Sequence, residues 1–115
     1  MPQKPPAVEI AMTGDLTGRL DDVVHQRTRL GILTVLHEGK GVDFGYLQKT
    51  LGLSAGNLSR HLSVLEESGL VQVKKGYEGR RGKTWVSNTR SGTVALRKEV
   101  KALKAIVNRI ESLDN

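Results

Sequence analysis

The sequence predicts a small, mainly α-helical domain that carries one β-hairpin. Apolar residues recur at intervals of three and four between residues 27 and 68, which is the period of an amphipathic helix. That period is lost between residues 70 and 88, where two short segments rich in β-branched and aromatic residues flank EGRRG. The chain of 115 residues is long enough for one domain of ordinary size.

The first elements follow from turn formers and apolar spacing. All three prolines lie within residues 1–15, where a flexible leader is expected; residues 16–115 are expected to form the single domain. Thr17 is placed to cap a short helix, expected over residues 16–24, with Leu20, Val23 and Val24 on one side. A second helix is predicted from about Arg27 to Glu38, ended by Gly39 and Gly41, and its inward residues are Leu30, Leu33 and Leu36.

Two further helices are predicted on either side of a tight turn. Asp43 is placed to cap the helix FGYLQKTL, and Gly52 turns the chain. Ser54 is placed to cap a fourth helix over residues 55–68, which Gly69 closes. The buried stripe of that helix is Leu58, Leu62 and Leu65, at steps of four and three. This pair of helices has the form of a helix-turn-helix.

The hairpin and a last helix complete the predicted order. LVQVKKGY and KTWVSN are expected to pair as strands across EGRRG. Trp85 is expected to pack against the helices, because a lone aromatic residue makes a poor stacking surface for single strands. Thr89 is placed to cap a helix over residues 90–113. An apolar seam runs along it, at steps of four, three, four and three: Leu96, Val100, Leu103, Val107 and Ile110.

Composition excludes several function classes. There is no cysteine, so disulfides, thiolate metal sites and cysteine nucleophiles are excluded. No stretch approaches the ~20 apolar residues of a membrane span, and nothing resembles a signal peptide. A cytoplasmic protein without membrane contact is expected. His25, His37, Asp21 and Asp22 do not match a metal-ligand spacing, so no metal and no cofactor is predicted.

Residues 52–56, GLSAG, match the G-x-S-x-G pattern of a serine-hydrolase nucleophile elbow. Such an elbow needs a strand before its serine, whereas FGYLQKTL has a helical period. A chain of this length also cannot build the large sheet that holds a hydrolase triad. We therefore expect no enzyme.

The distribution of charge indicates a polyanionic partner. The formal net charge is +6, and residues 72–90 hold six bases and one acid, so five of the six net charges lie in this segment. The side of the fourth helix opposite its leucines carries small and hydrogen-bonding residues that could enter a DNA major groove. The candidate DNA-binding residues are Ser54, Asn57, Ser59, Arg60 and Ser63 on this helix, and Lys74, Arg80, Arg81 and Lys83 on the hairpin.

The stretches HQRTRLGILTVL, LQKTLGLSAGNLSRHLSVLEESGLVQVKKG and GRRGKTWVSNTRSGTVAL together resemble compact winged-helix transcriptional regulators of the MarR/ArsR-like group, over roughly residues 25–107. The resemblance implies that residues 54–68 are a recognition helix and EGRRG the tip of a wing. It also implies a homodimer on a pseudo-palindromic operator. Cysteine-based metal sensing does not carry over, and any effector ligand is unknown.

Two alternatives stay open at this level. The seam of the last helix could be covered within one chain, or it could pair two chains together with Leu20 and Val23 of the first helix; we favour the dimer. The predicted function is a sequence-specific regulator that binds double-stranded DNA. The alternative is a winged helix that serves as a protein-interaction module, which would give no reason for arginines to concentrate at the hairpin tip.

Overall fold

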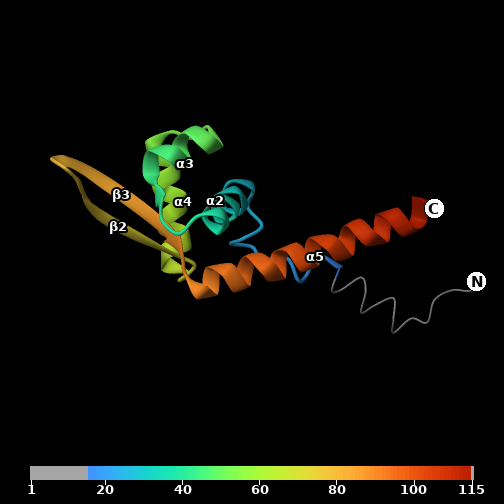
Figure 1. The fold of residues 1–115 in the computed structure, drawn as a ribbon. Coiled ribbons are helices and arrows are strands. Elements are labelled where there is room, and N and C mark those ends of the chain that lie inside the picture. The colour runs from blue at the N-terminus through green and yellow to red at the C-terminus, as the bar shows by residue number, and fades with distance from the viewer. Residues whose placement is uncertain (1–15, 115) are drawn as a thin grey trace, which may run out of the picture.

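The computed structural model describes residues 16–114 and shows a helical cluster with one projecting hairpin (Figure 1). The elements are, in chain order, α2 (Arg27–Glu38), β1 (Val42–Asp43), α3 (Phe44–Leu51), α4 (Ala55–Glu67), β2 (Val71–Glu78), β3 (Arg81–Asn88) and α5 (Arg90–Asp114). Helices α2, α3 and α4 lie together at the centre, the β2–β3 hairpin projects to one side, and α5 extends to the other (Figure 1). The leader expected over residues 1–15 lies outside the described residues.

The hairpin belongs to a three-stranded antiparallel sheet with the order β1-β3-β2. Val86 is the centre of the sheet, since it pairs with Val42 on one side and Val73 on the other. The sequence predicted the hairpin but not β1. Its two residues are too short to show an alternating pattern, and glycines precede them.

The core is aliphatic, as the scarcity of aromatic residues predicts. Its most deeply buried side chains come from every helix of the central cluster and from the sheet: Ile32, Leu33, Leu36, Leu47, Leu58, Leu65 and Val86. The leucine stripe predicted for α4 is confirmed, because Leu58, Leu62 and Leu65 are all buried. In α2, Ile32 and Val35 are buried as well, whereas the expected core residue Leu30 is only half-buried.

The caps predicted at Asp43, Ser54 and Thr89 are confirmed, whereas Thr17 caps no helix. Asp43 accepts the Tyr46 N–H, and Ser54 accepts the Asn57 N–H. Gly52 takes the left-handed conformation (φ 65°) between α3 and α4, as the predicted turn requires. Thr89 Oγ1 accepts the Gly92 N–H at 3.0 Å at the start of α5. These caps satisfy amide groups that have no partner inside the helix.

The helix predicted over residues 16–24 was wrong from residue 17 onward, because residues 17–26 form mainly turns and bends. The Asp21 carboxylate accepts the N–H groups of Val23 and Val24, at 2.8 and 3.1 Å. Such local bonding competes with helix formation. Leu20 and Val23 therefore do not form a helical stripe. Both are half-buried, and Val23 packs against the core of its own chain.

Among residues 16–114, no helix is long and apolar enough to cross a membrane.

Candidate nucleic-acid interface

Helix α4 presents a polar face while its leucines hold it to the core. Turned by 100° per residue from the buried stripe, the opposite side carries small and hydrogen-bonding side chains. All five candidates on it are exposed: Ser54, Asn57, Ser59, Arg60 and Ser63. Arg60 Nη2 donates to Asn57 Oδ1 at 3.2 Å, which ties the guanidinium to the start of the helix. The face is thus open and partly preorganised.

The serine of GLSAG has a structural role. Ser54 lies after a helix and not after a strand, and its hydroxyl caps α4 by accepting the Asn57 N–H at 3.1 Å. The strand-to-helix turn of a nucleophile elbow is therefore absent at this position. Within residues 16–114, no cluster of His, Cys, Asp and Glu could hold a metal ion.

Arg29 joins α4 to the segment before α2, a contact that no pattern in the sequence signals. Its Nε donates to the Val23 carbonyl at 2.7 Å, and its Nη1 lies 3.3 Å from His61 Nδ1 on α4. Burial lowers the pKa of His61, and the positive charges of Arg29 and Arg60 lower it further. The neutral imidazole can accept a hydrogen bond from the Arg29 guanidinium. His61 is half-buried and helps to hold α4 in place.

The hairpin tip is a two-residue turn, tighter than the predicted EGRRG loop, because Arg81 and Gly82 are already part of β3. Gly79 has a φ of 63° at the first central position, which suits a type II′ turn. Arg80 occupies the second position and is fully at the tip. Arg80, Arg81 and Lys74 are exposed, whereas Lys83 is half-buried.

Lys83 is engaged within the hairpin. Its Nζ lies 3.1 Å from Glu78 Oε1 and 5.2 Å from the centroid of the Trp85 ring. Trp85 is half-buried and pairs with Asp43 of β1 and Lys74 of β2. It alternates with the buried Val86, so it lies on the face of the hairpin away from the helices, contrary to the packing predicted for it. The charge of Lys83 is therefore partly compensated by Glu78, unlike that of Arg80.

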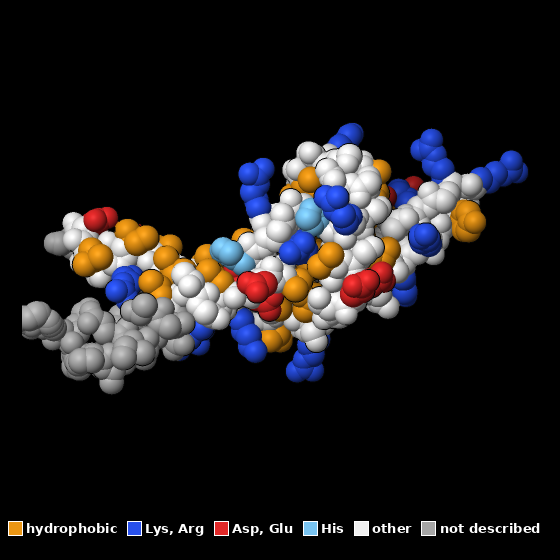
Figure 2. All heavy atoms as spheres, turned by 180° about the vertical axis from the view of Figure 1, so that it is seen from behind, with side chains coloured by type: hydrophobic (Ala, Val, Ile, Leu, Met, Phe, Trp, Pro, Cys, Tyr) orange, Lys and Arg blue, Asp and Glu red, His pale blue; other side chains and the backbone are white. Residues whose placement is uncertain are grey.

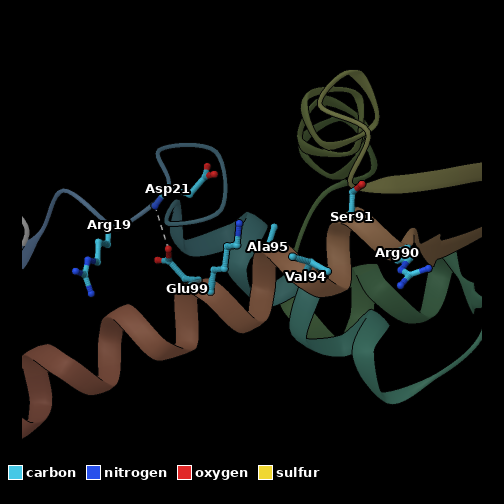
Figure 3. A pocket seen from close by; sticks show the side chains of 8 residues that line it. Arg19, Asp21, Arg90, Ser91, Val94, Ala95 and Glu99 are labelled. Atoms are coloured by element: carbon cyan, nitrogen blue, oxygen red, sulfur yellow. Dashed lines mark hydrogen bonds between the residues drawn. The ribbon is translucent and has the colours of Figure 1, made fainter.

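Glu99 on α5 is a buried carboxylate that the sequence reasoning missed. Its Oε1 accepts the Asp21 N–H at 3.0 Å (Figure 3), and its Oε2 lies 2.6 Å from His25 Nδ1. The side chain of Glu99 is fully enclosed, whereas that of His25 is about half exposed. Glu99 thus holds the turns of residues 17–26 against α5. The signal was present, since Glu99 lies three residues after the buried Leu96.

The apolar seam predicted for α5 is divided between buried and exposed residues. The buried line follows Gly92, Leu96, Glu99 and Ala102, so Leu96 belongs to the core of its own chain. Leu103 is half-buried. The other seam residues are exposed to solvent: Val100 (41%), Val107 (48%) and Ile110 (55%). Hydrophobic side chains gather along the distal part of α5 (Figure 2).

Known proteins resemble this arrangement. A family model for a winged helix DNA-binding domain matches residues 28–107. An uncharacterized protein of Methanocaldococcus jannaschii is 36% identical over 83 residues, which cover 72% of this chain and 90% of that protein.

Solved structures of other proteins have the same fold as this chain. A transcriptional regulator homologue from Pyrococcus horikoshii OT3 superposes with a TM-score of 0.77 at 31% identity, over 84% of this chain and 96% of that one. The fold is also that of the M. tuberculosis regulator MosR in complex with DNA, with a TM-score of 0.65 at 23% identity over 92% of this chain and 74% of that one. These two structures are those of a transcriptional regulator homologue and of a transcriptional regulator in complex with DNA. This chain belongs to the winged helix DNA-binding domain family.

Proposed function

We propose that the protein is a sequence-specific transcriptional regulator that binds double-stranded DNA as a homodimer. The observation that carries this proposal is the exposed polar face of α4 beside a hairpin that ends in Arg80. Clustered arginines and lysines at a hairpin tip suit a phosphate backbone and would serve a protein-interaction module poorly. The DNA in the MosR complex, on a chain of this fold, supports DNA as the partner.

In this proposal α4 enters the major groove. Its face is narrow, because Ser54, Ser59 and Ser63 are small, so the helix can approach the bases closely. Arg60 and Asn57 carry the donors and acceptors for base edges, and arginine commonly bonds guanine in two places. The serines and the amide groups at the start of α4 donate to phosphates. Base contacts select the site, while phosphate contacts hold the protein on it.

The hairpin is the second contact. Arg80 and Arg81 reach the backbone or a narrow minor groove, where planar guanidinium groups bind well. Lys74 and Lys83 add to the positive field of the hairpin, although Glu78 offsets Lys83. The hairpin therefore contributes affinity that depends on salt more than on sequence.

The distal face of α5 supports the homodimer. Val100, Val107 and Ile110 are exposed together with Leu113, and Leu103 is only half-buried between them. A second copy would remove these side chains from water. Two α4 helices related by two-fold symmetry would read two half-sites of a pseudo-palindromic operator. Leu20 and Val23, which lie on turns, are proposed at most for the margin of this interface.

The proposal is tested by selecting bound sequences from random duplexes. We expect one motif with two similar half-sites. The variant Arg60→Ala should lose roughly 1–3 kcal/mol of discrimination at one position of each half-site. Arg97→Ala, exposed on α5, is the matched control and should leave the motif unchanged. An unenriched pool would contradict sequence-specific binding.

A further inference from the structure

The two faces of the hairpin differ, and strand register assigns each residue to one of them. Side chains alternate along a strand, and directly paired residues share a face. One face carries Val71 and Val73 of β2, paired with Asn88 and Val86. Val71 and Val86 are buried, so this is the face that packs on the helices. It continues outward through the pairs Lys75–Thr84 and Tyr77–Gly82. We call the face that carries these two pairs the helix-side face.

The opposite face is defined by the pairs Lys74–Trp85, Gly76–Lys83 and Glu78–Arg81. We call it the outer face. Of its three cations, Lys83 is engaged, because it bonds Glu78 and lies over Trp85, whereas Lys74 and Arg81 are exposed. Glu78 also brings a negative charge that would repel a phosphate backbone.

Tyr77 is the unusual residue of the helix-side face. It is 79% exposed, which makes it one of the two most exposed large hydrophobic residues of the described chain. Its cross-strand neighbour is Gly82, which has no side chain to cover the ring. Figure 2 shows a hydrophobic side chain among the Lys and Arg side chains of the distal hairpin. A tyrosine so placed offers a ring for apolar contact and a hydroxyl for a phosphate oxygen.

Helix α4 lies on the same side of the sheet as this face. Its buried leucines share one core with Val71 and Val86. A duplex seated on the polar face of α4 and reached by the hairpin tip would meet the hairpin from the helices' side. Lys75 and Tyr77 are both exposed there.

We propose that Lys75 and Tyr77 contact the DNA backbone, and that the part of the outer face that carries Lys74, Lys83 and Trp85 turns away from the duplex. Arg81 lies beside the tip, and only there does the outer face reach the DNA together with Arg80. Lys75 neutralises a phosphate. Tyr77 packs its ring on the sugar and donates its hydroxyl to a phosphate. This inference rests on the proposed function and assigns which side of the hairpin performs it.

The test compares neighbouring lysines on opposite faces, by fluorescence anisotropy of the full chain with a labelled random duplex over a salt series. Each phosphate contact contributes about 0.9 to the slope of log affinity against log salt. We expect Lys75→Ala to reduce the slope by roughly two for a dimer, and Lys74→Ala by less than about half of that. We expect Tyr77→Ala to weaken binding about tenfold. Tyr77→Phe should recover only part of that loss. Thermal unfolding checks that the variants are folded.

The inference stands only if Lys75→Ala reduces the salt slope by more than Lys74→Ala does, and if Tyr77→Ala weakens DNA binding. Equal slopes for the two lysine variants, or an unaffected Tyr77→Ala, overturn it. If that happens while Arg80→Ala still weakens binding, the proposed function survives. If the unaltered protein shows no salt-dependent binding, the proposed function and this inference both fail.

Discussion

The two halves of α5 have the same helical period but different surroundings. In the first half, Gly92, Leu96, Glu99 and Ala102 are buried against the rest of the chain. In the second half, this side of the helix is more open: Ile106 and Arg109 are only half-buried, Ile110 is exposed, and Leu113 reaches 79%. A helical pattern thus shows that one face should be covered without showing what covers it. The first half builds the monomer, and we assign the second half to a second copy.

The largest expected effect concerns the first half, at Gly92. A Cβ there would lie 2.0 Å from the Leu70 carbonyl oxygen, which also accepts the Thr89 N–H. This oxygen is backbone and cannot swing aside. We expect Gly92→Ala to lower the free energy of unfolding in urea by about 3 kcal/mol or more. The matched control is Gly56→Ala on α4, where nothing lies within 4 Å. The Gly56→Ala variant should have a free energy of unfolding higher by about 0.5–1 kcal/mol. Equal effects of the two variants would contradict the close approach.

The next largest expected effect concerns Glu99, the buried carboxylate in the first half of α5. Glu99→Gln exchanges one oxygen that faces His25 for an amide and weakens the hold on residues 17–26. We expect a loss of about 2 kcal/mol in the free energy of unfolding. Glu111→Gln in the exposed second half is the control and should stay within about 0.5 kcal/mol. Urea unfolding at one fixed protein concentration measures both, because a dimer makes stability depend on concentration.

The second half should respond in assembly and not in folding. Val107→Glu places a charge on the exposed apolar face, so it should raise the dimer dissociation constant by about 100-fold, equivalent to ~2.7 kcal/mol. Sedimentation measures the change, and DNA affinity should fall with it. Asn108→Glu, on a neighbouring side of the helix, is the control and should sediment as the unaltered protein does. A Val107→Glu variant that sediments identically would remove α5 from the interface.

The smallest expected effect is the pH dependence of stability that comes from His61 on α4, beside Arg29. The pKa of His61 is lowered in the fold, so the unfolded chain binds the proton first as the pH falls. The stabilisation that neutral His61 provides is complete above its unfolded pKa of about 6.5 and is lost as the pH falls below that value. We expect His61→Gln to flatten the decline of stability between about pH 7 and pH 5. A parallel decline in the variant would show that His61 does not couple to folding.

The sequence was sufficient where one local rule decides the structure. Ser54, Asp43 and Thr89 cap their helices, and the leucines of α4 are buried, because spacing and capping chemistry act over a few residues. It was insufficient where distant groups decide. The turns of residues 17–26 depend on Asp21 and on Glu99, which is 78 residues further along the chain. The period of α5 allowed Val100 or Glu99 inside, and the contact with Asp21 selects Glu99.

The candidate interface divides in the same way. Its residues were predicted from charge clustering and from the α4 face, and the exposure of Arg60 and Arg80 agrees with that prediction. The engagement of Lys83 by Glu78 and Trp85 depends on strand register, and so does the choice of which of Lys74 and Lys75 faces the helices. Register cannot be read before the turn is known, because a shift of one residue exchanges the two faces.

The most direct test of the account is the affinity of the unaltered protein for a random duplex over a salt series. With about 6–8 phosphate contacts per dimer, we expect log affinity to fall with log salt at a slope of roughly −5 to −7. A slope near zero would contradict the central claim that the α4 face and the arginine-tipped hairpin together hold a DNA double helix.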